Sequence, residues 1–200
     1  MDSAYDANSI LLKGAFLFPI IHHPAYHADI PYGHRFPMGK FKRLMEVLKA
    51  DGLVRDHEFT PQPAPADWLA LAHDRHYVDQ VINGTVSSSI IRAIGFPVNP
   101  SVVMRGRCAV GGSVLTARLA LVHGIAANTA GGSHHARRQQ GAGFCLFNDV
   151  AVAVKQLQSE GAIRQALIID LDVHQGDGTA DIFSGDDTVF TFSLHAEKNY

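Results

Sequence analysis

The chain has 200 residues, 46% of them apolar, which is enough to bury one sizeable hydrophobic core. Its 17 Lys and Arg residues face 19 Asp and Glu residues, and the formal net charge is −2. Because no long run of one sign occurs, the composition argues against direct binding to nucleic acid, while it is compatible with a protein substrate.

The N-terminus and the two cysteines predict a cytoplasmic protein. The first residues are acidic where a secretory signal is basic, and the apolar stretch Ile10–Ile21 is interrupted by Lys13 and Pro19. This stretch is too short to span a bilayer, so we expect no membrane association. Cys108 and Cys145 form neither a CxxC pair nor a disulfide pattern, which favours a reducing compartment.

The N-terminal half is predicted to hold one strand and three helices. Apolar residues recur on one stripe of the first helix, which stops at Asp51-Gly52. In chain order we expect a strand over Lys13–Ile21, an irregular loop over His22–Pro37, a helix over Met38–Ala50, a proline-rich loop over Thr60–Pro65, and short helices over Ala66–Leu71 and Asp74–Ile82.

The C-terminal half alternates between helices and strands. In chain order we expect a long helix over Val110–His123, a strand over Ala126–Ala130, a helix over Asn148–Glu160, a strand over Ala166–Leu171, a helix over Gly178–Phe183 and a strand over Val189–Leu194. Alternation at these lengths predicts an α/β fold with a mostly parallel central sheet and helices packed on its faces. We see no internal repeat or linker, so a single domain over residues 1–200 is expected.

Side chains that can bind metal occur where the strand Ala166–Leu171 ends. Asp170, Asp172 and His174 occupy alternate positions, so an extended backbone places them on one face. Burying two carboxylates together is costly unless a cation compensates them, and Asp and His are both zinc ligands. Asp172 and His174 are therefore candidate ligands of a catalytic zinc, which needs a third. The alternative is a structural turn that caps the next helix.

A pair of histidines follows the preceding strand, in the glycine-rich loop Gly131–Ala136. His135 lies 35 residues before Asp170, a separation that suits one strand-helix-strand unit. Ligands of open α/β sheets bind at the carboxyl ends of the strands, so we expect the two segments to meet there. Adjacent imidazoles beside a metal can supply a general base and an electrostatic partner, if carboxylates such as Asp170 and Asp177 fix their tautomers. The alternative is a loop whose histidines bond only to nearby backbone.

A third segment, Gly141–Asp149, combines glycines with an aromatic residue. Gly143 lets the backbone approach a ligand closely, and Phe144 can wall a narrow apolar channel, although its pattern fits the hydrophobic core equally well. Asn148 suits the N-cap of the helix that follows.

The chain strongly resembles the zinc-dependent histone deacetylase family, of the arginase/deacetylase superfamily, in three ordered segments, Gly131–Ala136, Gly141–Asp149 and Asp170–Gly178. The similarity continues through Thr191–His195 and, more weakly, back to the first strand. His34–Lys40 and Gln175 are most similar to the class IV branch and its bacterial relatives. The resemblance implies the three-layer α/β/α fold of that superfamily.

The resemblance also implies a role for each matching residue. Asp172 and His174 would bind Zn²⁺, and zinc would polarise the amide carbonyl and a water, from which His135 removes a proton. The remaining implied roles are electrostatic support by His134, orientation of His135 and His134 by Asp177 and Asp170, an acyl-lysine channel at Gly143 and Phe144, an internal acetate channel at Arg35, and a K⁺ site at Asp170, Ser193 and Leu194.

The sequence departs from the family pattern in its length. Family catalytic domains are much longer, and their third zinc ligand, an aspartate, and a tyrosine that binds the oxyanion come from later segments. Tyr200 lies too early to be that tyrosine. We therefore expect residues 1–200 to be a single deacetylase-like catalytic domain that lacks its C-terminal part.

Three functions are compatible with these features. The leading hypothesis is a zinc-dependent amidohydrolase that removes acetyl or longer acyl groups from a lysine-containing protein or a small amine. The second is a non-catalytic module that binds acyl-lysine and retains an incomplete zinc pocket. The third is an unrelated hydrolase that holds two metal ions with the same carboxylates.

Overall fold

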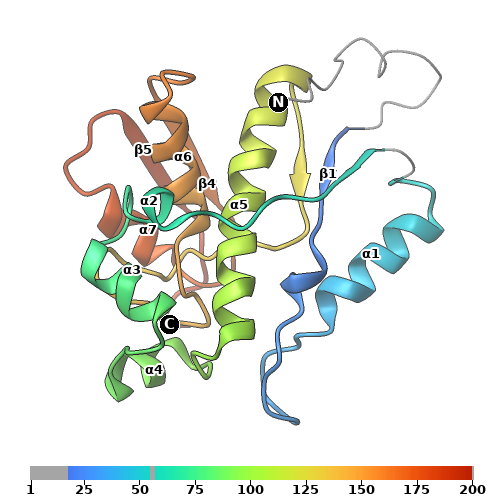
Figure 1. The fold of residues 1–200 in the computed structure, drawn as a ribbon. Coiled ribbons are helices and arrows are strands. Elements are labelled where there is room, and N and C mark those ends of the chain that lie inside the picture. Colours follow the sequence, from blue (N-terminus) through green and yellow to red (C-terminus); the bar gives the residue numbers. More distant parts are fainter. Residues whose placement is uncertain (1–17, 55–56, 200) are drawn as a thin grey trace.

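The computed structural model describes residues 18–54 and 57–199, and Figure 1 shows their arrangement. The elements in chain order are β1 (Ile20–Ile21), the 3₁₀ turn η2 (Pro24–Tyr26), α1 (Lys40–Ala50), β2 (Glu58–Phe59), α2 (Ala66–Leu69), α3 (Arg75–Ile82), α4 (Ser88–Ile94), α5 (Pro100–His123), β3 (Ala127–Asn128), α6 (Asp149–Ser159), β4 (Ala166–Asp170), α7 (Asp177–Ile182) and β5 (Val189–Ser193).

The strands form two sheets, and every pairing within the described ranges is parallel. One sheet has the order β2-β1-β3 and the other pairs β4 with β5. Ile20 of β1 packs against Met45 of α1 on one side, and α5 contacts β1 and β3 on the other, so helices cover both faces of the first sheet (Figure 1). This is the predicted three-layer α/β/α class, with the sheet divided in two because β3 and β4 are not hydrogen-bonded to each other.

Helix α5 is the centre of the fold and lies between the first sheet and α6 (Figure 1). Asn99 caps it, since its side chain accepts a hydrogen bond from the N–H of Val102, and Pro100 occupies the first turn. The helix therefore starts at Pro100, and the predicted start at Val110 was wrong by ten residues. The Asn-Pro pair is a helix start signal, which the sequence reading took for a loop.

The N-terminal elements also differ from the sequence prediction in strand β1, in helix α4 and in strand β2, which was not predicted. Of the predicted strand Lys13–Ile21, residues 13–17 lie outside the described part, and the strand β1 is Ile20–Ile21. Helix α4 was missed, although Ser87 caps it and Gly95 ends it with a φ of 77°. Only seven residues long, α4 carries too few turns to show a clear apolar period.

Two glycines let other segments pack directly on α5. A Cβ added to Gly111 would lie 1.9 Å from the carbonyl oxygen of Gln62, and one added to Gly112 would lie 2.2 Å from the hydroxyl of Tyr26. Both positions are buried in the middle of the helix. By contrast, a Cβ at Gly106 would meet Phe147 and Leu146 at 3.4 Å or more, which is an ordinary contact.

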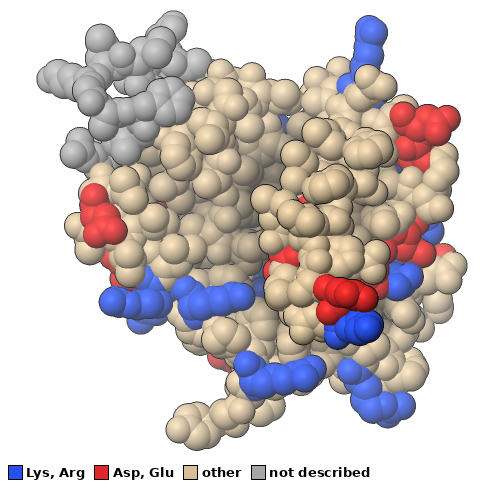
Figure 2. All heavy atoms as spheres, turned by 180° about the vertical axis from the view of Figure 1, so that it is seen from behind, with Lys and Arg blue, Asp and Glu red and all other residues tan. Residues whose placement is uncertain are grey.

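The second sheet leaves one apolar face uncovered by the described residues. Leu167 and Ile169 on β4 and Phe190 and Phe192 on β5 point to that face, and each exposes about half or more of its surface. The view from behind shows broad areas without charged side chains (Figure 2). Such a contiguous apolar surface is typical of an interaction site.

None of the helices in residues 18–54 and 57–199 combines the length and the apolar character needed to cross a bilayer.

We expect Gly111→Ala to destabilise the fold and Gly106→Ala to leave it unchanged or slightly more stable. The first change forces a methyl group into the backbone of Gln62, which should cost about 2–3 kcal/mol and lower Tm by roughly 5–10 °C. The second gains helix propensity without a clash. Thermal unfolding monitored by circular dichroism measures both. Equal Tm values for the two variants would contradict the packing described here.

Candidate active site

The loop after β3 and the end of β4 meet, as the sequence predicted. His134 Nδ1 lies 2.6 Å from Asp170 Oδ2, and both side chains are largely buried. The loop also packs on the N-terminus of α7, since Thr179 N–H donates to the carbonyl oxygen of His134 at 3.0 Å. A single cluster of contacts thus joins segments that are more than 30 residues apart in sequence.

The ring of His135 is held by a carboxylate at the start of α7. Its Nδ1–H donates to Asp177 Oδ1 at 2.8 Å, and Arg137 donates to the other oxygen of Asp177 at 2.6 Å. This tautomer leaves the lone pair on Nε2. Burial lowers the pKa of His135, and the hydrogen bond to Asp177 opposes that shift. The ring is therefore kept neutral, as a general base requires.

Asp172 and His174 lie beside this histidine pair. Asp172 Oδ1 accepts hydrogen bonds from the N–H of His174 at 2.8 Å and from its Nδ1 at 3.0 Å, and lies 3.8 Å from His134 Nε2. The ring centroids of His135 and His174 are 5.8 Å apart. Partial burial raises the pKa of Asp172, but the hydrogen bonds from His174 and the charge of His134 outweigh it and keep the pKa below its usual value.

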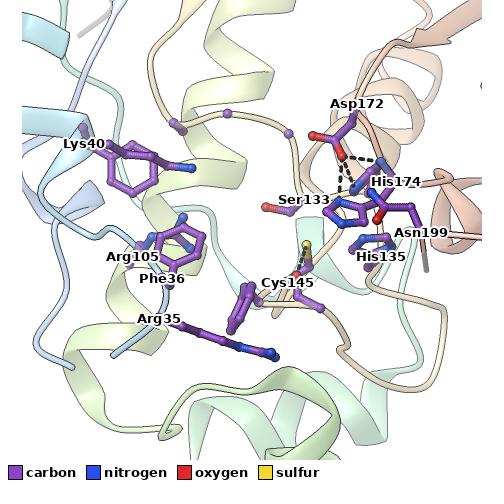
Figure 3. A pocket seen from close by; sticks show the side chains of 17 residues that line it. Arg35, Phe36, Lys40, Arg105, Ser133, His135, Cys145, Asp172, His174 and Asn199 are labelled. Atoms are coloured by element: carbon purple, nitrogen blue, oxygen red, sulfur yellow. Dashed lines mark hydrogen bonds and ion pairs between the residues drawn. The ribbon is translucent and has the colours of Figure 1, made fainter. Parts of the chain in front are cut away.

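His134, His135, Asp172 and His174 line one pocket of about 520 Å³ (Figure 3). Asp170 and Asp177 do not line it but are hydrogen-bonded to the two histidines. The pocket is lined by Arg35, Phe36, Lys40, Phe41, Arg105, Ala130, Gly131, Gly132, Ser133, His134, His135, Gly143, Phe144, Cys145, Asp172, His174 and Asn199. The predicted site residues Arg35, Gly143 and Phe144 are among them. The roles assigned to these residues stay predictions.

Gly143 and Phe144 are fixed in the left-handed region of backbone space, with φ values of 52° and 65°. A Cβ on Gly143 would lie 2.4 Å from Cδ2 of His135, so only glycine lets this backbone contact the imidazole. Their N–H groups donate to the carbonyls of Ala93 and Ile94 at the end of α4. The missed helix therefore holds Phe144 in a conformation that is unfavourable for a side chain.

Arg35 and three aromatic rings surround Phe144. The guanidinium carbon of Arg35 lies 4.8 Å from the ring centroid of Phe144, whose ring also contacts His34, Phe36 and Phe96. Phe144 thus lines the pocket and also packs, partly buried, against the hydrophobic core.

Asp172 and His174 have the donor atoms that a zinc site needs. Carboxylate oxygen and imidazole nitrogen are suitable zinc donors, and here they converge within 3.0 Å of each other at the edge of the pocket. A catalytic zinc takes three protein ligands. The described residues contain no group of three or more His, Cys, Asp or Glu side chains able to hold a metal, so the two predicted ligands have no third partner among them.

The residues predicted to bind K⁺ lie together at the ends of β4 and β5. Asp170 and Ser193 are paired across β4 and β5 and line a separate cavity of about 180 Å³. Ser193 Oγ accepts the N–H of Gly176 at 3.2 Å, and Leu194 N–H donates to the carbonyl oxygen of Asp170 at 3.0 Å.

Asn148 and Asp149 organise the histidine loop, a role that sequence reasoning missed. Asn148 caps α6 as predicted, and its side-chain amide also donates to the carbonyl of Ala136 and to the hydroxyl of Thr179. Asp149 Oδ1 accepts the N–H of Ser133 at 2.7 Å. Both residues are almost fully buried. The sequence does carry a signal for this role, because two adjacent polar residues stand directly before the apolar run Val150–Val154 of α6.

His73 holds the same region from outside the pocket. Its Nδ1–H donates to the carbonyl of Arg137 at 2.8 Å, and its Nε2 accepts the N–H of Asn148 at 2.9 Å. Burial lowers its pKa to about 4, and hydrogen bonds to backbone carbonyls oppose that shift only in part. A protonated ring could not accept from Asn148, so the fold requires neutral His73.

We expect stability to fall as the pH drops from 7 to 5, because unfolded His73 takes up a proton near pH 6.5 whereas folded His73 does so only near pH 4. The unfolded state binds more protons in this window, which costs the native state about 2 kcal/mol by pH 5. His73→Gln should remove that part of the pH dependence, and His76→Gln, at an exposed position of the same segment, should keep it. Urea unfolding at both pH values tests this. An unchanged slope in His73→Gln would show that another group causes it.

Comparison with known proteins places the chain among deacetylase-like sequences. The family model described as a histone deacetylase domain matches residues 34–200. An uncharacterized protein of Picosynechococcus sp. is 50% identical over 184 residues, covering 92% of this chain and 61% of the relative. Histone deacetylase 2 of Arabidopsis thaliana is 29% identical over 174 residues, covering 84% and 45%.

A solved structure agrees with the sequence matches. The crystal structure of an HDAC homolog complexed with SAHA is similar with a TM-score of 0.78 at 27% identity, covering 90% of this chain and 51% of that one. The chain therefore spans between about half and three fifths of the length of these relatives.

Proposed function

Because the chain belongs to the histone deacetylase family, we propose that it forms part of a zinc-dependent amidohydrolase that removes acyl groups from lysine side chains or small amines. One observation carries this proposal. His134, held by Asp170, and His135, held by Asp177, line the same pocket as the carboxylate and imidazole of Asp172 and His174.

Asp172 and His174 would hold the zinc ion. When bound, zinc supplies a Lewis acid that polarises an amide carbonyl and lowers the pKa of a water molecule. The donor types fit, and the convergence of the two side chains supports the assignment. The third ligand would come from outside the residues described.

His135 is proposed as the general base. Asp177 holds its Nδ1–H, so Nε2 can accept a proton from the attacking water and return it to the nitrogen of the departing amine. Arg137 fixes Asp177 in turn. His134, held by Asp170, is placed to provide electrostatic support 4.0 Å away, measured between ring centroids. Gly143 and Phe144 would line the channel for the acyl-lysine stem.

We propose that residues 1–200 are the N-terminal part of a single catalytic domain. The apolar face of β4 and β5 supports this, because Leu167, Ile169, Phe190 and Phe192 lie uncovered where a further layer would pack. The difference in length from the relatives also supports it. The remaining zinc ligand and a tyrosine that binds the oxyanion would then belong to the C-terminal part.

We further propose a structural K⁺ ion beside Asp170, Ser193 and Leu194, since carboxylate, hydroxyl and carbonyl oxygens are donors suited to a hard cation. A cytoplasmic location is proposed from the two cysteines, which are buried free thiols.

We expect thorough chelation to abolish hydrolysis of a fluorogenic acyl-lysine by the protein as its gene encodes it, and zinc to restore it. His135→Ala should lower kcat by about 10²- to 10⁴-fold with zinc retained, because it removes the proton acceptor. His123→Ala, at the far end of α5, is the matched control and should leave kcat unchanged. Activity that survives chelation would defeat the proposal.

The other two functions predict different results from the same protein. A binding module would retain a hydroxamate without turnover of any acyl-lysine, and an unrelated two-metal hydrolase would contain close to two transition-metal ions per chain. Elemental analysis and hydroxamate calorimetry measure these quantities. The zinc amidohydrolase predicts one zinc ion per chain together with turnover.

A further inference from the structure

The wall of the pocket that faces away from Asp172 and His174 carries two cations, Lys40 and Arg105 (Figure 3). Neither forms an ion pair with an acidic side chain anywhere in the described ranges of the chain. Among the acidic residues, Asp172 alone lines the pocket, and the proposed function commits its charge to zinc. Two cations without an ion-pair partner among the described residues are thus concentrated at one end of the cavity, while the charge of Asp149 favours the charged form of Arg105.

Arg105 is a buried cation, and its neighbours hold the side chain in place. It is 7% exposed, its guanidinium carbon lies 5.0 Å from the ring centroid of Phe41 and 5.5 Å from that of Phe36, and its Nε–H donates to the carbonyl of Tyr26 at 3.2 Å. The described residues contain no buried side-chain nitrogen or oxygen without a hydrogen-bond partner. The terminal N–H groups, for which the protein supplies no acceptor, therefore border the pocket.

Lys40 approaches the same aromatic rings from α1. Its Nζ lies 4.6 Å from the ring centroid of Phe36 and 5.2 Å from that of Phe41. Burial and the charge of Arg105 lower the pKa of Lys40, while the charge of Asp172 raises it. The ammonium group thus lies within electrostatic reach of both Arg105 and the proposed metal ligand.

An anion with an aliphatic stem fits this end of the pocket best. The charge of Arg105 disfavours the charged form of Lys40, and an anion bound between the two side chains would offset this repulsion. A guanidinium presents paired donors that match a carboxylate, an ammonium adds a point charge, and the surrounding phenylalanines favour methylene groups over water. A carboxylate meets all three conditions.

We propose that Lys40 and Arg105 form a carboxylate-binding subsite at the end of the pocket opposite Asp172 and His174. This rests on the proposed function and names its substrate class, amides whose acyl chain ends in a second carboxylate, such as glutaryl-lysine. Hydrolysis breaks the amide C–N bond, the acyl carbon gains the oxygen of water, the amine nitrogen gains a proton, and a dicarboxylate is released. A released monocarboxylic acid offers the same chemistry as a second source of the ligand.

Direct binding tests the subsite independently of turnover. Glutarate and acetate are titrated by calorimetry into the full gene product, both metal-free and zinc-loaded. Lys40→Met should raise the Kd of glutarate at least tenfold, because one of the two charges is lost. Lys42→Met, on the same helix but not among the residues that line the pocket, is the matched control and should not change it. Arg105→Lys tests the second cation, and circular dichroism checks that it folds.

Kinetics then distinguish the two sources of the carboxylate. If a dicarboxylic acyl group is the ligand, the kcat/KM of glutaryl-lysine exceeds that of the matched terminal amide, and Lys40→Met lowers this ratio at least tenfold while Lys42→Met does not. If the released acid is the ligand, the ratio is near one and Lys40→Met instead raises the inhibition constant of acetate.

A Kd for both acids that is equal in wild type, Lys40→Met and Arg105→Lys would overturn the subsite. Absence of any acyl-lysine turnover in wild type would overturn the proposed function instead, and the calorimetric result would still stand.

Discussion

The first turn of α7 lies directly against the backbone of the histidine loop, and the geometry of the pocket depends on this contact. A Cβ on Gly178 would lie 2.5 to 2.6 Å from backbone atoms of His134, His135 and Ala136, so only glycine allows the approach. The contact brings Asp177 beside His135 and lets Thr179 bond to the loop. Because α7 follows β4 directly, the same contact also places Asp170 behind His134.

Buried polar groups around this contact share their hydrogen bonds so that none is left unsatisfied among the described residues. Asn148 alone joins the end of the loop, α6 and α7, and His73 joins it to the segment before α3. In a low-dielectric interior each such bond is worth more than at the surface, and each missing partner costs more. The network therefore makes the imidazole positions rigid before any ligand binds.

The two walls of the pocket carry different charges. Acidic and imidazole groups lie on one wall and cations on the other (Figure 3). The rings of Phe36, Phe41 and Phe144 lie between these two walls. Lys40 contacts the ring face of Phe36, Arg105 that of Phe41 and Arg35 that of Phe144. Cation–π contacts stabilise these charges without neutralising them, so they remain available to an anion. The α4 carbonyls that hold Phe144 in the left-handed region therefore help to position one of these aromatic rings.

The sequence by itself determined the parallel α/β class and the meeting of two strand ends, because these follow from the alternation of strands and helices and from the common edge of parallel strands. The pairing of each histidine with an aspartate was implied by the resemblance to histone deacetylases. It also identified Asn148 as a cap. Only the tertiary structure decided that Asn148 also holds the histidine loop, that α4 fixes Phe144, and that Arg105 and Lys40 converge from α5 and α1. These contacts join residues between 12 and 69 positions apart, and no local periodicity encodes which distant side chain fills a given space.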